Sequence, residues 1–106
     1  MTKGWIAGIA VVLSLMGSQA ARAGVVIFSD DFNSTAQSLN QTAFANWDVT
    51  QGSVDVIGDG GPYAFLPVGN GNYVDLNGST GQPGQLTTKM IFAAGTYTVT
   101  FDLAGS

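Results

Sequence analysis

The chain has 106 residues, with three basic and seven acidic side chains and a formal net charge of −4. Histidine and cysteine are absent, which removes the commonest general base, the commonest transition-metal ligand and any disulfide support. So few cations cannot supply the phosphate contacts on which nucleic-acid affinity depends, and they argue equally against contact with an anionic membrane surface. The length leaves room for one small domain.

Residues 1–23 have the three parts of an export signal. Lys3 supplies an early cation, an apolar stretch runs from Trp5 to Met16, and Ala21-Arg22-Ala23 is a small-x-small cleavage pattern. The alternative, a membrane-spanning helix, needs about 20 apolar residues, and this stretch stops at Gly17. We therefore predict a signal peptide that forms a helix and takes no part in the mature fold.

Residues 24–106 are then the mature domain, which we expect at the cell surface or in the extracellular matrix. These 83 residues carry Lys89 as their only cation against seven aspartates, a net charge of −6. Sandwiches usually have seven or more strands in roughly 100 residues, and this sequence stops directly after an amphipathic strand. We therefore predict the N-terminal part of a β-sandwich, a fragment whose remaining strands and any anchor follow Ser106.

Six segments of this mature part alternate apolar and polar residues, as strands with one buried and one wet face do. They are Val25–Phe28, Phe44–Thr50, Ser53–Ile57, Asn72–Asn77, Leu86–Phe92 and Thr96–Leu103. Residues expected to point into the core are Val54, Val56, Val74, Leu76, Tyr97, Val99, Phe101 and Leu103. The connection 93–95 is short enough to join the last two strands as an antiparallel hairpin. Without later strands, we expect the core face of the last strand to be only partly covered.

Two long connections separate the strands, and long connections inside a compact domain are usually functional or disordered. Residues 58–71 are rich in Gly and Pro yet carry the aromatic residues Tyr63 and Phe65. Such rings stack on the apolar face of a sugar, although they can also simply plug the end of a sandwich. The predicted ligand-binding residues are Tyr63, Phe65, Asn70, Asn72 and Asp59, whose amides and carboxylate suit hydroxyl groups.

The other long connection, residues 29–43, opens with two carboxylates. Asp30 and Asp31, joined by Asp102, could give oxygen ligands to a structural calcium ion. The alternative is that they are ordinary turn and capping carboxylates, and we favour it. Trp47 begins an alternating strand, so we expect it in the core rather than on a sugar-binding surface.

Four motifs carry a family resemblance. They are Asp31-Phe32-Asn33 and the runs Trp47–Gly58, Gly71–Gly78 and Gly95–Gly105. In this order they resemble the bacterial exosortase-sorted proteins with a PEP-CTERM anchor, in particular the choice-of-anchor C group, which is similar to a plant cell-wall domain of unknown function. The resemblance covers nearly all of the chain from the first motif to its end. It implies a galactose-binding-like jelly roll, often associated with extracellular carbohydrate.

Catalysis is the rival class. A glycosidase needs a pair of carboxylates, and seven aspartates supply some pair by chance, but three of them (Asp48, Asp75 and Asp102) alternate with apolar residues and should face solvent or an edge. We therefore predict a non-catalytic exported module that associates with extracellular polysaccharide. The alternative is a purely structural surface or matrix component without a specific ligand, and a glycan-active enzyme is less favoured than either.

Overall fold

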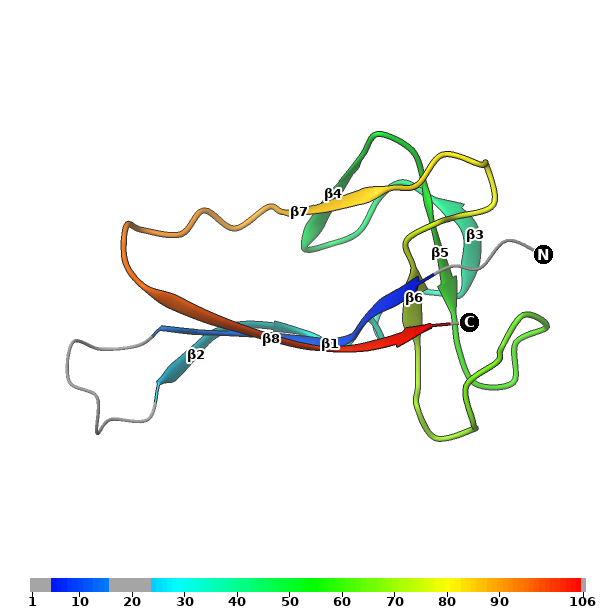
Figure 1. Ribbon diagram of the computed structural model, residues 1–106, viewed down its shortest axis with the longest axis horizontal. Coiled ribbons are helices and arrows are strands. Elements are labelled where there is room, and N and C mark those ends of the chain that lie inside the picture. The colour runs from blue at the N-terminus through cyan, green and yellow to red at the C-terminus, as the bar shows by residue number, and fades with distance from the viewer. Residues whose placement is uncertain (1–4, 16–23, 106) are drawn as a thin grey trace.

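The computed structural model describes residues 5–15 and 24–105 (Figure 1). These residues form eight strands and no helix, so the predicted all-β class is confirmed. The strands are β1 (Trp5–Leu15), β2 (Val25–Asp30), β3 (Ser38–Gln41), β4 (Trp47–Thr50), β5 (Val54–Ile57), β6 (Tyr73–Asp75), β7 (Gln85–Thr88) and β8 (Tyr97–Gly105). Accordingly, the described part of the chain contains no helix that could cross a membrane.

Two antiparallel sheets give a β-sandwich-like arrangement. The larger sheet has the strand order β2-β1-β6-β5-β3, with β8 paired to β1, and the smaller sheet consists of β4 and β7. Figure 1 shows β4 and β7 as a layer that faces β1, β2 and β8. All six predicted strand segments overlap a strand, whereas β3 lies in a connection that was expected to be irregular.

The expectation of a leader helix outside the fold is wrong for this structure, because residues 5–15 form strand β1. This strand pairs with β2, β6 and β8. Its run WIAGIAVVLSL has β-branched residues at four positions, which favour a strand. A strand in this place also satisfies backbone groups of three neighbouring strands, which a helix would leave unpaired. The cleavage pattern at residues 21–23 lies outside the described residues, so the domain boundary stays a prediction.

The predicted hairpin between the last two strands is also wrong. Strand β7 pairs with β4, from Trp47 opposite Thr88 to Thr50 opposite Gln85, while β8 pairs with β1. Residues 89–96 instead cross from the smaller sheet to the larger one (Figure 1). Within this crossing, the Phe92 ring packs edge-on against Phe28 in β2 at a centroid distance of 6.1 Å. A connection that crosses between layers cannot form a tight turn within one sheet.

The core lies between the two sheets and takes side chains from β2, β4, β5 and β6. Its buried members are Phe28, Phe32, Phe44, Trp47, Val54, Val56 and Val74. The expectation that Trp47 belongs to the core is therefore confirmed, as is the inward orientation of the β5 and β6 valines. In β8, by contrast, Val99, Phe101 and Leu103 are 56%, 54% and 54% exposed. These three residues are not core, and the partly covered apolar face expected for the last strand is present.

Candidate functional site

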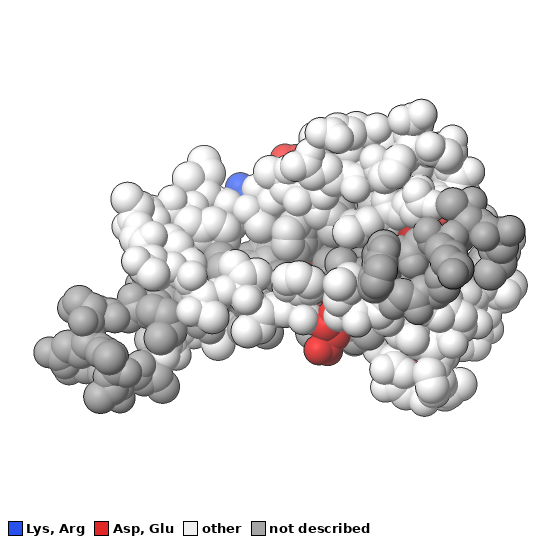
Figure 2. All heavy atoms as spheres, in the orientation of Figure 1, with Lys and Arg blue, Asp and Glu red and all other residues white. Residues whose placement is uncertain are grey.

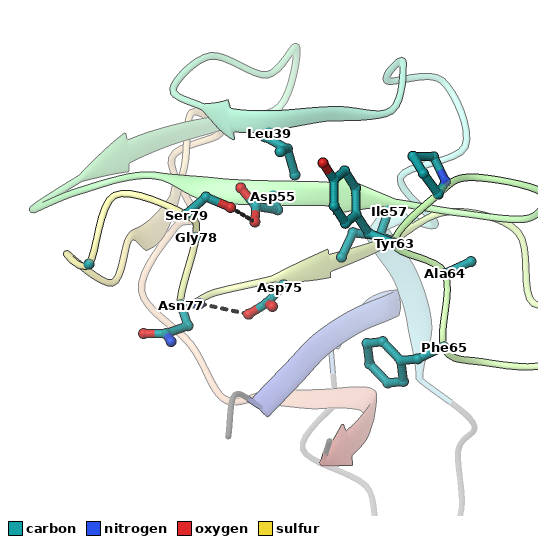
Figure 3. Close-up of a pocket in the computed structure, with 12 residues that line it drawn as sticks. Leu39, Asp55, Ile57, Tyr63, Ala64, Phe65, Asp75, Asn77, Gly78 and Ser79 are labelled. Carbon is teal, nitrogen blue, oxygen red and sulfur yellow. Dashed lines mark hydrogen bonds between the residues drawn. The ribbon is translucent and has the colours of Figure 1, made fainter. Parts of the chain in front are cut away.

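An open pocket of about 760 Å³ lies over β5 and β6, beside the loop at residues 58–71. Its lining has an aromatic end and a polar end (Figure 3). Pro62, Tyr63, Ala64, Phe65, Ile57 and Leu39 form the first, while Asp55, Asp75, Asn77, Gly78, Ser79 and Gly81 form the second.

Two carboxylates define the polar end. Asp55 in β5 and Asp75 in β6 are directly opposite each other in the antiparallel ladder, so their side chains lie on the same face of the sheet. Asp55 is only 5% exposed; its Oδ1 accepts the Asn40 N–H at 2.8 Å and its Oδ2 accepts the Ser79 hydroxyl at 2.6 Å. Like charges in this position repel each other, and these donors offset part of that repulsion.

Asp75 is the more open of the two carboxylates. It is half-buried, and its Oδ1 accepts the Asn77 N–H at 2.9 Å, which closes a tight turn at the end of β6 (Figure 3). A carboxylate has about four acceptor positions. Asp75 therefore keeps acceptor capacity directed at the pocket, next to the fixed carboxylate of Asp55.

The aromatic end is held in place by a buried hydroxyl. Tyr73 Oη accepts the N–H groups of Phe65 at 3.0 Å and Leu66 at 3.4 Å. The Phe65 ring also packs edge-on against the Tyr73 ring, with centroids 5.4 Å apart. Tyr63 is 59% exposed and presents its ring to the pocket beside Leu39 (Figure 3). The loop therefore displays one largely free ring and one ring that also anchors the loop.

Three other predicted ligand-binding residues lie outside the pocket lining and make contacts within the chain. Asp59 Oδ2 accepts the Gly69 N–H at 2.9 Å, and the Asn70 side chain donates to a carbonyl of the same loop at 2.6 Å. The Asn72 amide donates to the carbonyl oxygens of Phe32 and Thr35, at 3.3 and 2.7 Å. In this structure these three side chains shape the loop and tie it to residues 32–35.

The structure thus brings together Tyr63 and Phe65 with a polar set that sequence reasoning missed: Asp55, Asp75, Asn77 and Ser79. The alternation of β5 and β6 was visible in the sequence, but it gives no register between two strands. The register alone places Asp55 opposite Asp75. A pair of Asp residues at equivalent positions of neighbouring strands was the signal available.

The carboxylates proposed for calcium make turn and capping contacts. Asp30 accepts the Phe32 N–H at 2.8 Å, the Asn46 amide at 3.1 Å and the Trp47 indole N–H at 2.9 Å. Asp102 lies on β8 and is exposed. Within the described residues, no three acidic, histidine or cysteine side chains come together as a metal-binding group. The observed contacts of Asp30 are those of the turn-and-capping alternative.

Asp31 makes a similar turn contact at the surface, where its Oδ1 accepts the Asn33 N–H at 3.0 Å. This backbone N–H, followed by the Asn33 side chain, holds the pKa of the Asp31 carboxyl below its ordinary value. A low pKa keeps the group charged, which suits a capping carboxylate as well as it would suit an ion ligand.

The surface offers little charge to a partner. Figure 2 shows a face that is mostly uncharged, with small separate acidic and basic spots. Among residues 24–105, Lys89 is the sole cation, and its Nζ donates to the Phe44 carbonyl at 2.9 Å and lies 3.9 Å from Asp48 Oδ1. The described surface therefore has no basic patch for a polyanion.

No protein-family model, curated protein or solved structure matches this chain. The pocket itself is therefore the best guide to function.

Proposed function

We propose that the mature chain is a non-catalytic exported module that binds extracellular carbohydrate through the pocket beside Tyr63. The observation that carries the proposal is the pairing, in one open pocket, of an exposed aromatic ring with two adjacent carboxylates. Sugars have an apolar face of C–H groups and a rim of hydroxyls, and these two surfaces match the two ends of the pocket.

The chemistry favours a neutral polysaccharide. Sugar hydroxyls can donate to the free acceptor positions of Asp75, and a neighbouring hydroxyl can reach the Asn77 side chain, which also lines the pocket. Such donors would offset the repulsion between two carboxylates that face each other across strands. An acidic sugar would instead place a third negative charge beside the two carboxylates of the pocket, in a domain whose net charge is already −6. Binding should also depend little on salt, because a neutral ligand releases no counterions.

The proposal extends to fold family and location. We infer a galactose-binding-like jelly roll from the exosortase-sorted, PEP-CTERM group, acting at the cell surface or in the extracellular matrix. The export pattern of residues 1–23 and the four sequence motifs support this inference, and the β-sandwich-like architecture is compatible with it.

A glycan-active enzyme is less favoured on the geometry of the same pair. Glycosidases use one carboxyl group as a proton donor and the other as a nucleophile or base. Both oxygens of Asp55 accept hydrogen bonds, from Asn40 and Ser79, so this group is arranged as an acceptor. A purely structural component without a ligand remains the second candidate, favoured by the apolar face that β8 leaves exposed.

The test is a pull-down of the exported protein on a panel of neutral and acidic polysaccharides. Tyr63→Ala and Asp75→Asn should each weaken binding about tenfold, equivalent to about 1.4 kcal/mol, because one removes the stacking surface and the other an acceptor charge. Val68→Ala is the matched control, since Val68 lies in the same loop, is 84% exposed and does not line the pocket. Circular dichroism checks that every variant is folded.

Three outcomes would change the proposal. If folded Tyr63→Ala and Asp75→Asn bind like the parent, this pocket is not the sugar site. If the parent protein binds no polysaccharide, the structural-component candidate replaces the carbohydrate-binding proposal. Release of new reducing ends from a bound polysaccharide would show that the module is an enzyme.

A further inference from the structure

Strand β1 lies in the larger sheet between β8 on one side and β2 and β6 on the other, and we call the position that it occupies the slot. One of its edges pairs first with β6, at Ile6 and Ala7, and then with β2, over Val11–Leu15. Its other edge pairs with β8 from Trp5 to Leu15, with an irregularity after Ala7. Among the described strands, β8 has β1 as its only ladder partner. Removal of the export leader would therefore leave unpaired backbone on β2, β6 and β8 together.

The geometry of β1 specifies what can replace it. All three of its ladders are antiparallel, so a new strand must run in the direction of β1. It must also be extended, because unpaired edges of this kind accept a strand that completes the ladder. Strand β8 of the same chain does not meet this condition, since it runs parallel to β2 and β6.

We propose that, once the leader is removed, the slot is filled by β8 of a second copy of this chain. A second β8 that pairs antiparallel with the first has the direction of β1, and it therefore fits the ladders of β2 and β6 as well. By two-fold symmetry, each copy's β8 fills the slot of the other. The sheet then runs without a break through both copies, and the interface closes on itself as a dimer.

The side chains of β8 suit this self-pairing. Val99, Phe101 and Leu103 form an apolar row that is more than half exposed. Nine residues pair fully when the two-fold axis passes through Phe101, the middle of Tyr97–Gly105. In that register Val99 lies opposite Leu103, and Asp102 lies opposite Thr100 rather than opposite the other Asp102. Apolar residues then face apolar residues, and no two carboxylates are directly opposed.

The inference depends on leader removal and not on the sugar site. It is tested on protein that is expressed from the full gene, exported and sequenced from its N-terminus. Light scattering should give twice the mass of the processed chain. A synthetic peptide with the sequence of residues 5–15 should convert this dimer into monomers that each hold one peptide, whereas a scrambled peptide should leave the dimer intact.

Single cysteines then locate the interface, because the natural chain has none. Phe101→Cys places two thiols across the proposed axis, and Val68→Cys places a thiol on an exposed loop as the control for random collision. We expect at least about tenfold more disulfide-linked dimer from Phe101→Cys. Thr100→Pro should abolish the dimer, because proline cannot complete a central ladder.

A processed chain that stays monomeric at high concentration would overturn the proposal, as would retention of Met1 on the exported protein. Open-ended aggregates instead of dimers would also overturn it, since they imply an interface that does not close. Equal cross-linking of the two cysteine variants would place the contact elsewhere.

Discussion

The two ends of the larger sheet differ in what covers them. At the β5–β6 end, the smaller sheet helps to cover the strands, and Val54, Val56 and Val74 are each at most 1% exposed. At the β8 end, three apolar residues of a strongly alternating strand remain more than half exposed. The same period-two pattern therefore describes a core strand in one place and a partly bare strand in the other.

This difference shows what alternation can and cannot predict. Alternation assigns side chains to the two faces of a strand, and it identified the buried valines of β5 and β6 correctly, whereas Val99, Phe101 and Leu103 of β8 are exposed. Burial also needs a second layer over that face, and the layer comes from residues far away in the sequence. Trp47 and Leu86 of the smaller sheet pack in one core with the valines of β5 and β6, whereas β8 pairs with β1 and adds Tyr97 at the edge of that core.

The largest expected effect comes from Phe32, which sits at the centre of the closed end. Its ring is fully buried, stacks on Trp47 at a centroid distance of 6.0 Å and meets Phe44 edge-on. Phe32→Ala should lower the free energy of unfolding by about 3–5 kcal/mol, which is enough to unfold a domain of marginal stability. Urea unfolding of the full chain measures this loss, and the milder Phe32→Leu keeps the comparison measurable if the alanine variant does not fold.

Phe101→Ala is the matched control at the open end. Because this ring is 54% exposed, its removal from the full chain should cost no more than about 1 kcal/mol. Similar losses for the two phenylalanines would contradict the contrast between the ends.

The sequence predicted elements better than it predicted their partners. The residues of β2, β4, β5, β6, β7 and β8 alternate or are rich in apolar and Thr residues, and each lies within or overlaps a predicted segment. Strand β7 pairs with β4 rather than β8, and the connection that follows it packs Phe92 against Phe28; no local pattern reveals either contact. Residues 5–15 were expected as a helix because they form the apolar part of an export-signal pattern. An apolar run of this length also fits a strand, and the pairing with β2, β6 and β8 is not visible in the local sequence.

The candidate site shows the same limit. Tyr63 and Phe65 stood out because rings are unusual in a Gly-rich loop, and both line the pocket. Asn72 looked equally suited to a sugar, but its amide is used by two backbone carbonyls. Asp55 was not singled out in the sequence, yet its carboxylate accepts hydrogen bonds from Asn40 and Ser79 and lines the pocket. Both outcomes depend on contacts between residues more than 10 positions apart.

A second prediction separates a capping role from a metal-binding role for Asp30. Asp30 ends β2 and accepts from the buried Phe32 and Trp47. Asp30→Ala leaves both donors without this acceptor and should cost about 2–3 kcal/mol in unfolding free energy. Asp30→Asn keeps an acceptor oxygen and should cost less. EDTA or added calcium should leave the melting midpoint of the parent unchanged, and a calcium-dependent rise would instead support the ion site with Asp31 and Asp102.

The smallest expected effect is electrostatic and concerns Asp31, the exposed residue that follows Asp30. The Asn33 N–H, and after it the Asn33 side chain, depress the pKa of Asp31 in the folded state. A carboxyl with a depressed folded pKa contributes stability that is present above its unfolded pKa and is lost as the pH falls through its folded pKa. Melting midpoints should therefore fall more steeply on acidification for the parent than for Asp31→Asn, in which this group no longer titrates. The difference should be confined to the acid range and should be small, because Asp31 is exposed and solvent screens its interactions. Parallel curves for the two proteins would show that the Asn33 contact does not persist in solution.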